Sequence, residues 1–61
     1  MNLFNKIMYS DNESFWARRN GVYYEVRLEN EVIALYHVKG FKDKQDALEF
    51  FLNQLELKRA G

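Results

Sequence analysis

The stretch from Lys39 to Leu55 constrains the fold more than any other part of this sequence, because it joins a glycine turn to an amphipathic helix. Gly40 follows an apolar segment, and Asp43 is a residue type that caps helix N-termini. Asp46 follows three residues later, at the second position of a capping box. We therefore expect a helix within residues 43–59, beginning near Lys44.

Three strands are expected before this helix, within residues 14–39. Asn20-Gly21 favours a two-residue hairpin turn between strands at 14–19 and 22–28. Glu29-Asn30-Glu31 separates the second strand from a third at 32–39. This order predicts an α+β fold, in which a three-stranded antiparallel meander packs on one C-terminal helix.

The N-terminal segment, residues 1–13, has two interpretations. Leu3, Phe4, Ile7 and Met8 are spaced to share one face of a short helix, but an extra strand fits the segment as well. The chain is expected to be a single domain spanning 1–61, close to the lower size limit for a self-supporting core.

A turn at Asn20-Gly21 would pair Arg19 with Val22 and so assign the strand residues to two faces. The expected core face consists of Phe15, Ala17, Val22, Tyr24, Val26 and Leu28. It should receive a helix stripe made of Leu48, Phe51, Leu52 and Leu55, with Phe41 at the corner. The opposite face consists of Trp16, Arg18, Tyr23, Glu25 and Arg27.

The third strand is apolar on both of its sides, which is unusual for the edge of a sheet. Either the N-terminal segment covers its second side or another chain does, which would be a second copy or a target protein. The mixture of aromatic, aliphatic and basic residues on this side is typical of contact surfaces. The candidate protein-binding or base-reading residues are Trp16, Tyr23, Arg27, Ile33, Leu35 and His37.

The charges balance in number, with nine basic and nine acidic residues, but the meander separates them in space. The first turn, the end of the third strand and the start of the helix should lie at one end. A basic end beside a helix N-terminus suits a phosphate or another anion. The residues expected there are Arg18, Arg19, Lys39, Lys42 and Lys44.

No residue pattern indicates an enzyme. The chain has no cysteine and a single histidine, so we expect neither a disulfide nor a metal site, and no cofactor. Ser10 and Ser14 have no evident general base, and we assign no catalytic residue. There is no apolar run of membrane-spanning length, and the expected location is the cytoplasm.

The sequence from Lys39 to Ala47, preceded by three strands, resembles the small DNA-binding domain of tyrosine integrases and the plant ethylene-response-factor domain. The specific part of this resemblance is Gly40-Phe41 with Ala47. It implies that the exposed side of the sheet reads DNA in the major groove. The residues that it implicates are Trp16, Arg18, Tyr23, Arg27, His37 and Lys39. Glu25 in the middle of that side and the neutral net charge depart from the family pattern.

Two classes of function follow from these features. The first is a small protein-binding regulator or inhibitor, of the type found in phages and mobile elements, that acts by occupying a partner's surface. The second is a DNA-binding accessory protein that uses the exposed sheet face and the basic end. The neutral charge favours the first class, and the Gly40-Phe41 junction favours the second.

Overall fold

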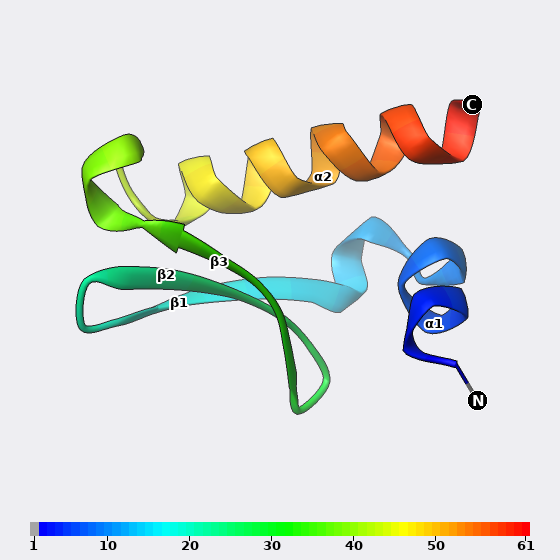
Figure 1. The fold of residues 1–61 in the computed structure, drawn as a ribbon, viewed down its shortest axis with the longest axis horizontal. Helices are drawn as coiled ribbons and strands as arrows, with labels where there is room; N and C mark the ends of the chain where they lie inside the picture. The colour runs from blue at the N-terminus through cyan, green and yellow to red at the C-terminus, as the bar shows by residue number, and fades with distance from the viewer. Residues whose placement is uncertain (1) are drawn as a thin grey trace.

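The computed structural model describes residues 2–61, which form one antiparallel sheet and two α-helices (Figure 1). The elements are α1 (Leu3–Tyr9), β1 (Phe15–Asn20), β2 (Tyr23–Leu28), β3 (Glu31–His37) and α2 (Lys44–Ala60). Two short 3-10 helices, η1 (Asn12–Ser14) and η2 (Val38–Gly40), precede β1 and follow β3. The predicted α+β meander with a C-terminal helix is confirmed, and the N-terminal segment contains a helix rather than a strand.

The first hairpin turns one residue later than we predicted. Asn20 is the last residue of β1 and pairs with Tyr23, so that the turn consists of Gly21 and Val22. Gly21 has a φ of 63°, whereas Val22 has no positive φ. This combination suits a type II′ turn, in which only the first central residue needs positive φ. The predicted pairing of Arg19 with Val22 is therefore wrong, and Val22 lies exposed in the turn instead of in the core.

The predicted division of β1 and β2 into two faces survives this error. Phe15 pairs with Leu28 rather than with Val26, which moves each partner by two residues. Because side chains alternate with a period of two, a shift of two residues leaves every side chain that lies within β1 and β2 on its predicted side. Val26 and Leu28 are accordingly in the core, with 0% and 2% of their surfaces exposed.

A β-bulge in β3 places its apolar residues differently from a regular strand. Val26 pairs with Ala34 but Arg27 pairs with Val32, so that Ile33 is an extra residue between the two pairs. Ile33 and Ala34 therefore both pack against the core, together with Tyr36. The bulge explains how β3 buries part of its apolar side chains while Val32 and Leu35 remain exposed on the other side.

The core lies between α2 and one side of the sheet (Figure 1). Leu48 and Leu55 of α2 are buried against Phe15, and the ring of Phe51 lies 5.3 Å from the Phe15 ring. Ala47, outside the predicted stripe, is completely buried. The predicted N-cap is confirmed, because the Asp43 side chain accepts a hydrogen bond from the Asp46 amide at 2.8 Å.

The short helix α1 has no fully buried residue, but Ile7 and Met8 pack against the edge of the core and polar contacts add to this attachment. Arg59, in the last turn of α2, donates from Nε to the carbonyl of Met8 and from Nη2 to the carbonyls of Ile7 and Ser10. These carbonyls lie at the C-terminal end of α1, where helix carbonyls lack intrahelical partners. Lys6 of α1 also pairs with Glu29 of the β2–β3 turn, at 2.6 Å.

Candidate functional site on the outer face of the sheet

The side of the sheet that faces away from α2 is not covered by any part of residues 2–61 (Figure 1). Opposed residues of antiparallel strands share a face, so the register arranges this side in rows that cross the three strands. We call these residues the outer face. Its rows are Trp16–Arg27–Val32, Arg18–Glu25–Leu35 and Asn20–Tyr23–His37.

Glu25 occupies the centre of the outer face, yet only 7% of its surface is exposed. Arg18 Nε donates to Glu25 Oε1 at 2.7 Å, and Arg27 Nη1 donates to the same oxygen at 3.1 Å. Asn20 Nδ2 donates to Oε2 at 3.1 Å. Both carboxylate oxygens therefore have partners, which compensates for the loss of hydration. We call Glu25 with its three partners the Glu25 cluster.

The cluster lowers the pKa of Glu25 from its ordinary value of 4.5 to about 2. The hydrogen bond from Arg18 is the largest cause, the bond from Asn20 is the next, and burial opposes them. Since a general acid or base works best with a pKa near the working pH, Glu25 is unsuited to proton transfer at neutral pH. Its ionised carboxylate instead holds two arginine side chains in position.

Arg27 is fixed on several sides. Its Cζ lies 5.3 Å from the centre of the Trp16 ring, which is within the range of cation–π attraction. Its Nη2 donates to the carbonyl of Asn30 at 3.1 Å. Arg27 thus connects the Glu25 carboxylate, the Asn30 carbonyl and the Trp16 ring.

Large apolar side chains stand exposed around the cluster. Trp16 and Tyr23 are 42% and 44% exposed, and Leu35 is 55% exposed. The Tyr23 ring meets the His37 ring edge-on, with 5.8 Å between their centres. The outer face thus has a charged centre surrounded by apolar, partly aromatic side chains.

The structure brings together most of the residues that we predicted for a protein-binding or base-reading face. Trp16, Tyr23, Arg27, Leu35 and His37 all lie on the outer face. Ile33 does not, because the bulge places it on the side of the core, where it is partly buried. The assignment of Ile33 to this face is therefore wrong.

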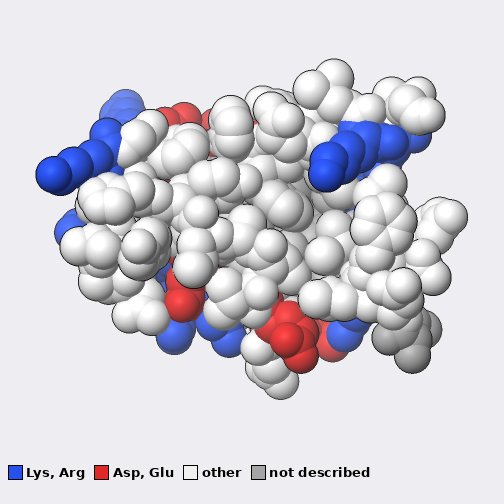
Figure 2. Space-filling view, viewed as in Figure 1, with Lys and Arg blue, Asp and Glu red and all other residues white. Residues whose placement is uncertain are grey.

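The five residues predicted for the basic end lie where the first hairpin turn, η2 and the start of α2 come together (Figure 1). Figure 2 shows lysine and arginine side chains at this end of the molecule. Two of the five have internal partners, since Arg18 pairs with Glu25 and Arg19 Nε donates to the Gly21 carbonyl at 3.1 Å. Lys39, Lys42 and Lys44 are exposed.

The amides at the start of α2 are partly occupied by the chain itself. Asp43 accepts from the Asp46 amide, and the Asp46 side chain accepts from the Lys42 amide at 3.1 Å. These carboxylates take up donors that a phosphate at a helix N-terminus would use, and they add negative charge. The geometry is consequently less favourable to an anion than the lysines alone suggest.

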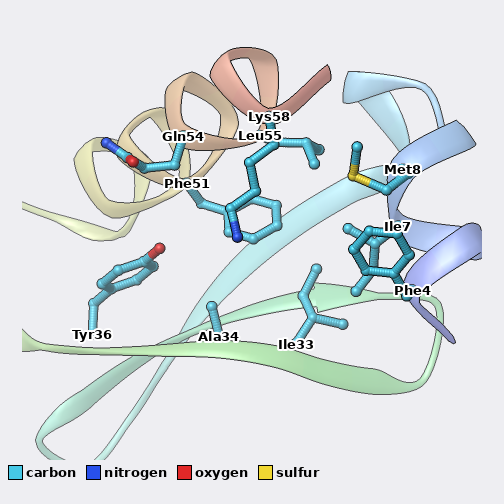
Figure 3. Close-up of a pocket in the computed structure, with 10 residues that line it drawn as sticks. All are labelled: Phe4, Ile7, Met8, Ile33, Ala34, Tyr36, Phe51, Gln54, Leu55 and Lys58. Carbon is cyan, nitrogen blue, oxygen red and sulfur yellow. The ribbon is translucent and has the colours of Figure 1, made fainter. Parts of the chain in front are cut away.

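A hollow lies on the opposite side of the sheet, where α1, β3 and α2 meet (Figure 3). We call it the groove; its volume is about 400 Å³, and Figure 3 labels its ten lining residues. All but Gln54 and Lys58 are apolar or aromatic. Burial raises the pKa of one of them, Tyr36, above its ordinary value of 10.

Sequence reasoning missed the Glu25 cluster and the groove. A signal for the cluster was present, because Glu25 shares its predicted face with Arg18 and Arg27. The groove had no such signal, since it depends on how α1 docks against β3 and α2. Residues 2–61 contain no group of three or more histidine, cysteine or acidic residues placed to hold a metal ion.

None of the described helices has the length and apolar character needed to cross a membrane. In comparisons with known proteins, no protein-family model, curated protein or solved structure matches this chain.

Proposed function

We propose that this chain is a protein-binding regulator that occupies a partner's surface with its outer face. The observation that carries the proposal is the ring of exposed apolar side chains, above all Trp16, Tyr23 and Leu35, around the Glu25 cluster. Tryptophan, tyrosine and arginine are the residues that most often dominate the energetics of protein interfaces.

The rigidity of the outer face supports the proposal. Trp16 rests on Arg27, and Arg27 is itself fixed by Glu25 and Asn30. A side chain that is already ordered loses less conformational entropy when a partner covers it, so more of the contact energy appears as affinity. All three exposed apolar residues also lie in paired strands, which hold the backbone beneath them.

The electrostatics favour a protein partner over a nucleic acid. Arg18 and Arg27 are the cations of the outer face, and both donate to Glu25. Phosphate contacts need basic groups whose charge is not cancelled nearby. An apolar protein surface needs no such charge and would cover Trp16, Tyr23 and Leu35 directly.

The test is photo-crosslinking in cells that naturally produce the chain. A photoreactive amino acid replaces Leu35 in one variant and Leu57 in the control. Leu57 is 68% exposed on α2, so both sites are open to solvent. We expect a defined covalent adduct from position 35 that disappears when Trp16→Ser is added. Adducts formed only from position 57 would overturn the proposal.

A second candidate function is DNA binding, which the gathering of basic side chains at one end favours (Figure 2). In this version Lys39, Lys42 and Lys44 contact phosphates while the outer face meets the bases. We place it second because the arginines of the outer face already have an acidic partner.

The DNA-binding candidate predicts a steep salt dependence. Affinity for a short duplex should fall as salt rises from 50 to 200 mM, with a slope set by the number of phosphates contacted. The double variant Lys42→Gln and Lys44→Gln should reduce that slope by about 2 units, since each lost phosphate contact removes about one. A slope that stays unchanged in this variant would rule out the basic end as a DNA contact.

A further inference from the structure

The groove on the α2 side of the sheet has the character of a small-molecule site. Its volume of about 400 Å³ falls within the range of ligand pockets in proteins. Its walls come from three elements, with Phe4, Ile7 and Met8 of α1 on one side. Ile33 and Ala34 of β3 lie along the floor, as Figure 3 shows. Water in such a groove finds few polar partners, so an apolar occupant would displace it favourably.

Among the described residues, 2–61, Lys58 is the only charged one that lines the groove. In Figure 3 its side chain extends from α2 across the groove, with the amine in front of the Phe51 ring. Within residues 2–61, none of the ion pairs involves Lys58, whereas Lys6, Arg18, Arg27 and Arg59 all pair with glutamates. The groove thus presents one uncompensated cation to an otherwise uncharged cavity.

The two ends of the groove limit what can enter. In Figure 3, α1 stands at one end and the Tyr36 ring at the other. Tyr36 is held there by edge-on contacts with Phe41 and Phe50, at 5.2 and 5.6 Å between ring centres. A partner helix laid along α2 would meet α1, because α1 closes that end. A short flexible chain can lie within the groove without meeting α1.

We propose that the groove binds an alkyl chain that carries a carboxylate, with the chain along β3 and the carboxylate at Lys58. The single cation and the apolar walls are complementary to a molecule with one anionic end and an apolar body. Hydroxyl and amide groups are few in the groove, so a sugar or a nucleotide would lose hydration without replacement. This inference concerns the side of the sheet opposite to the outer face and does not depend on the proposed function.

The test is a titration of the chain with sodium decanoate below its micelle concentration, by calorimetry and by amide chemical shifts. We expect binding whose shifts centre on Ala34 and Phe51. Octanoate should bind more weakly, by about fourfold for each methylene removed. Shifts that centre on Trp16 and Tyr23, or no dependence on chain length, would overturn the proposal.

Variants test the two parts of the site separately. Ala34→Leu fills the floor and should weaken decanoate binding at least tenfold. If that variant does not fold, Phe4→Ser gives the second test, because Phe4 is 60% exposed and its loss removes only a wall of the groove. Decanoate affinity unchanged in a folded Ala34→Leu or Phe4→Ser variant would contradict the site.

Lys58→Met tests the charge. It should weaken decanoate binding about two- to fivefold, as for a solvent-accessible ion pair, and should strengthen the binding of decylamine, whose ammonium group the Lys58 amine repels. Lys39→Met is the matched control, since Lys39 is exposed in η2 and does not line the groove. Equal effects of the two substitutions would show that Lys58 does not hold the carboxylate.

The oligomeric state tests whether a second copy of the chain fills the groove. If the wild-type chain is a dimer and the Phe4→Ser variant is a monomer, a second copy occupies the groove, and the proposal would be overturned.

Discussion

The two sides of the same sheet are stabilised in opposite ways. On the side of α2, Val26 and Leu28 are enclosed by apolar side chains and need no polar partner. On the outer face, Glu25 is almost as deeply enclosed but depends on three hydrogen-bonding neighbours. The difference shows that the outer face is an ordered structure in its own right, although no helix covers it.

The two sides of the sheet also differ in what their apolar side chains can do, since one side stabilises the fold and the other is available to a partner. Apolar side chains on the α2 side are buried and so contribute to folding. Those on the outer face remain between 41% and 55% exposed, so much of their apolar surface is still available to a partner. Four substitutions, one on each kind of contact, test this separation in order of expected effect.

Leu28→Ala should have the largest effect on stability. Truncating a buried leucine costs about 2–5 kcal/mol, because transfer energy is lost and a cavity forms. A chain of 61 residues has a total stability of about 3–9 kcal/mol, so the variant should lose a large fraction of it. Urea unfolding followed by circular dichroism measures the change, and a loss below about 0.5 kcal/mol would contradict the assigned core.

Glu25→Gln should have the next largest effect, and its size should depend on pH. The folded-state pKa of about 2 lies below the ordinary value of 4.5. The ionised carboxylate therefore stabilises the fold fully above pH 4.5, and this contribution is lost as pH falls from 4.5 towards 2. The difference in urea midpoint between wild type and variant should be largest near neutral pH and smallest near pH 2.

Glu13→Gln is the matched control for this pH dependence. Glu13 is exposed in η1 and takes part in no ion pair within residues 2–61, so the same chemical change should leave the pH profile unaltered. A midpoint difference for Glu25→Gln that does not vary with pH would show that the Glu25 cluster does not act as described.

Arg59→Met should release α1 at a smaller cost in stability, about 1–2 kcal/mol, because hydrogen bonds to a charged group are lost at a partly exposed site. Amide hydrogen exchange should accelerate in residues 3–9 and stay unchanged in β2. Lys58→Met is the control, since Lys58 precedes Arg59 in α2 and makes none of the hydrogen bonds to α1. Equal exchange in the two variants would argue against the role of Arg59.

Leu35→Ser should have the smallest effect on stability, within about 0.5 kcal/mol, because Leu35 is more than half exposed. It compares directly with Leu28→Ala, since both leucines lie on the same sheet but on opposite sides. A loss of more than 1 kcal/mol in urea unfolding would mean that the outer face contributes to folding. It would contradict the division between one side that stabilises the fold and another that is available to a partner.

The sequence predicted the elements well where local signals were strong. Asp43 and the spacing of Leu48 and Leu55 located α2, because capping and helical periodicity are properties of neighbouring residues. The faces of β1 and β2 were predicted correctly although the turn was placed wrongly. The strand pairing was wrong by two residues, and such a shift leaves side chains on the same side of the sheet.

The features that escaped prediction all depend on contacts between distant segments. The bulge at Ile33 arises from pairing with β2, and no residue within β3 marks it. Arg59 lies in the last turn of α2, where a basic residue suits the helix dipole, but its hydrogen bonds to α1 span about 50 positions in the chain. The groove follows from that docking, so the candidate site opposite the outer face could not be anticipated from local patterns.

The most direct test of the central claim is the affinity of the partner captured from position 35 for purified variants of this chain. Isothermal titration would compare the double variant Trp16→Ser and Tyr23→Ser with Leu57→Ser, whose substituted residue is exposed on α2. If the outer face is the contact surface, the double variant should weaken binding by at least about thirtyfold, corresponding to about 2 kcal/mol, while Leu57→Ser binds as wild type does. Equal affinities for the two variants, with both folded, would contradict the account.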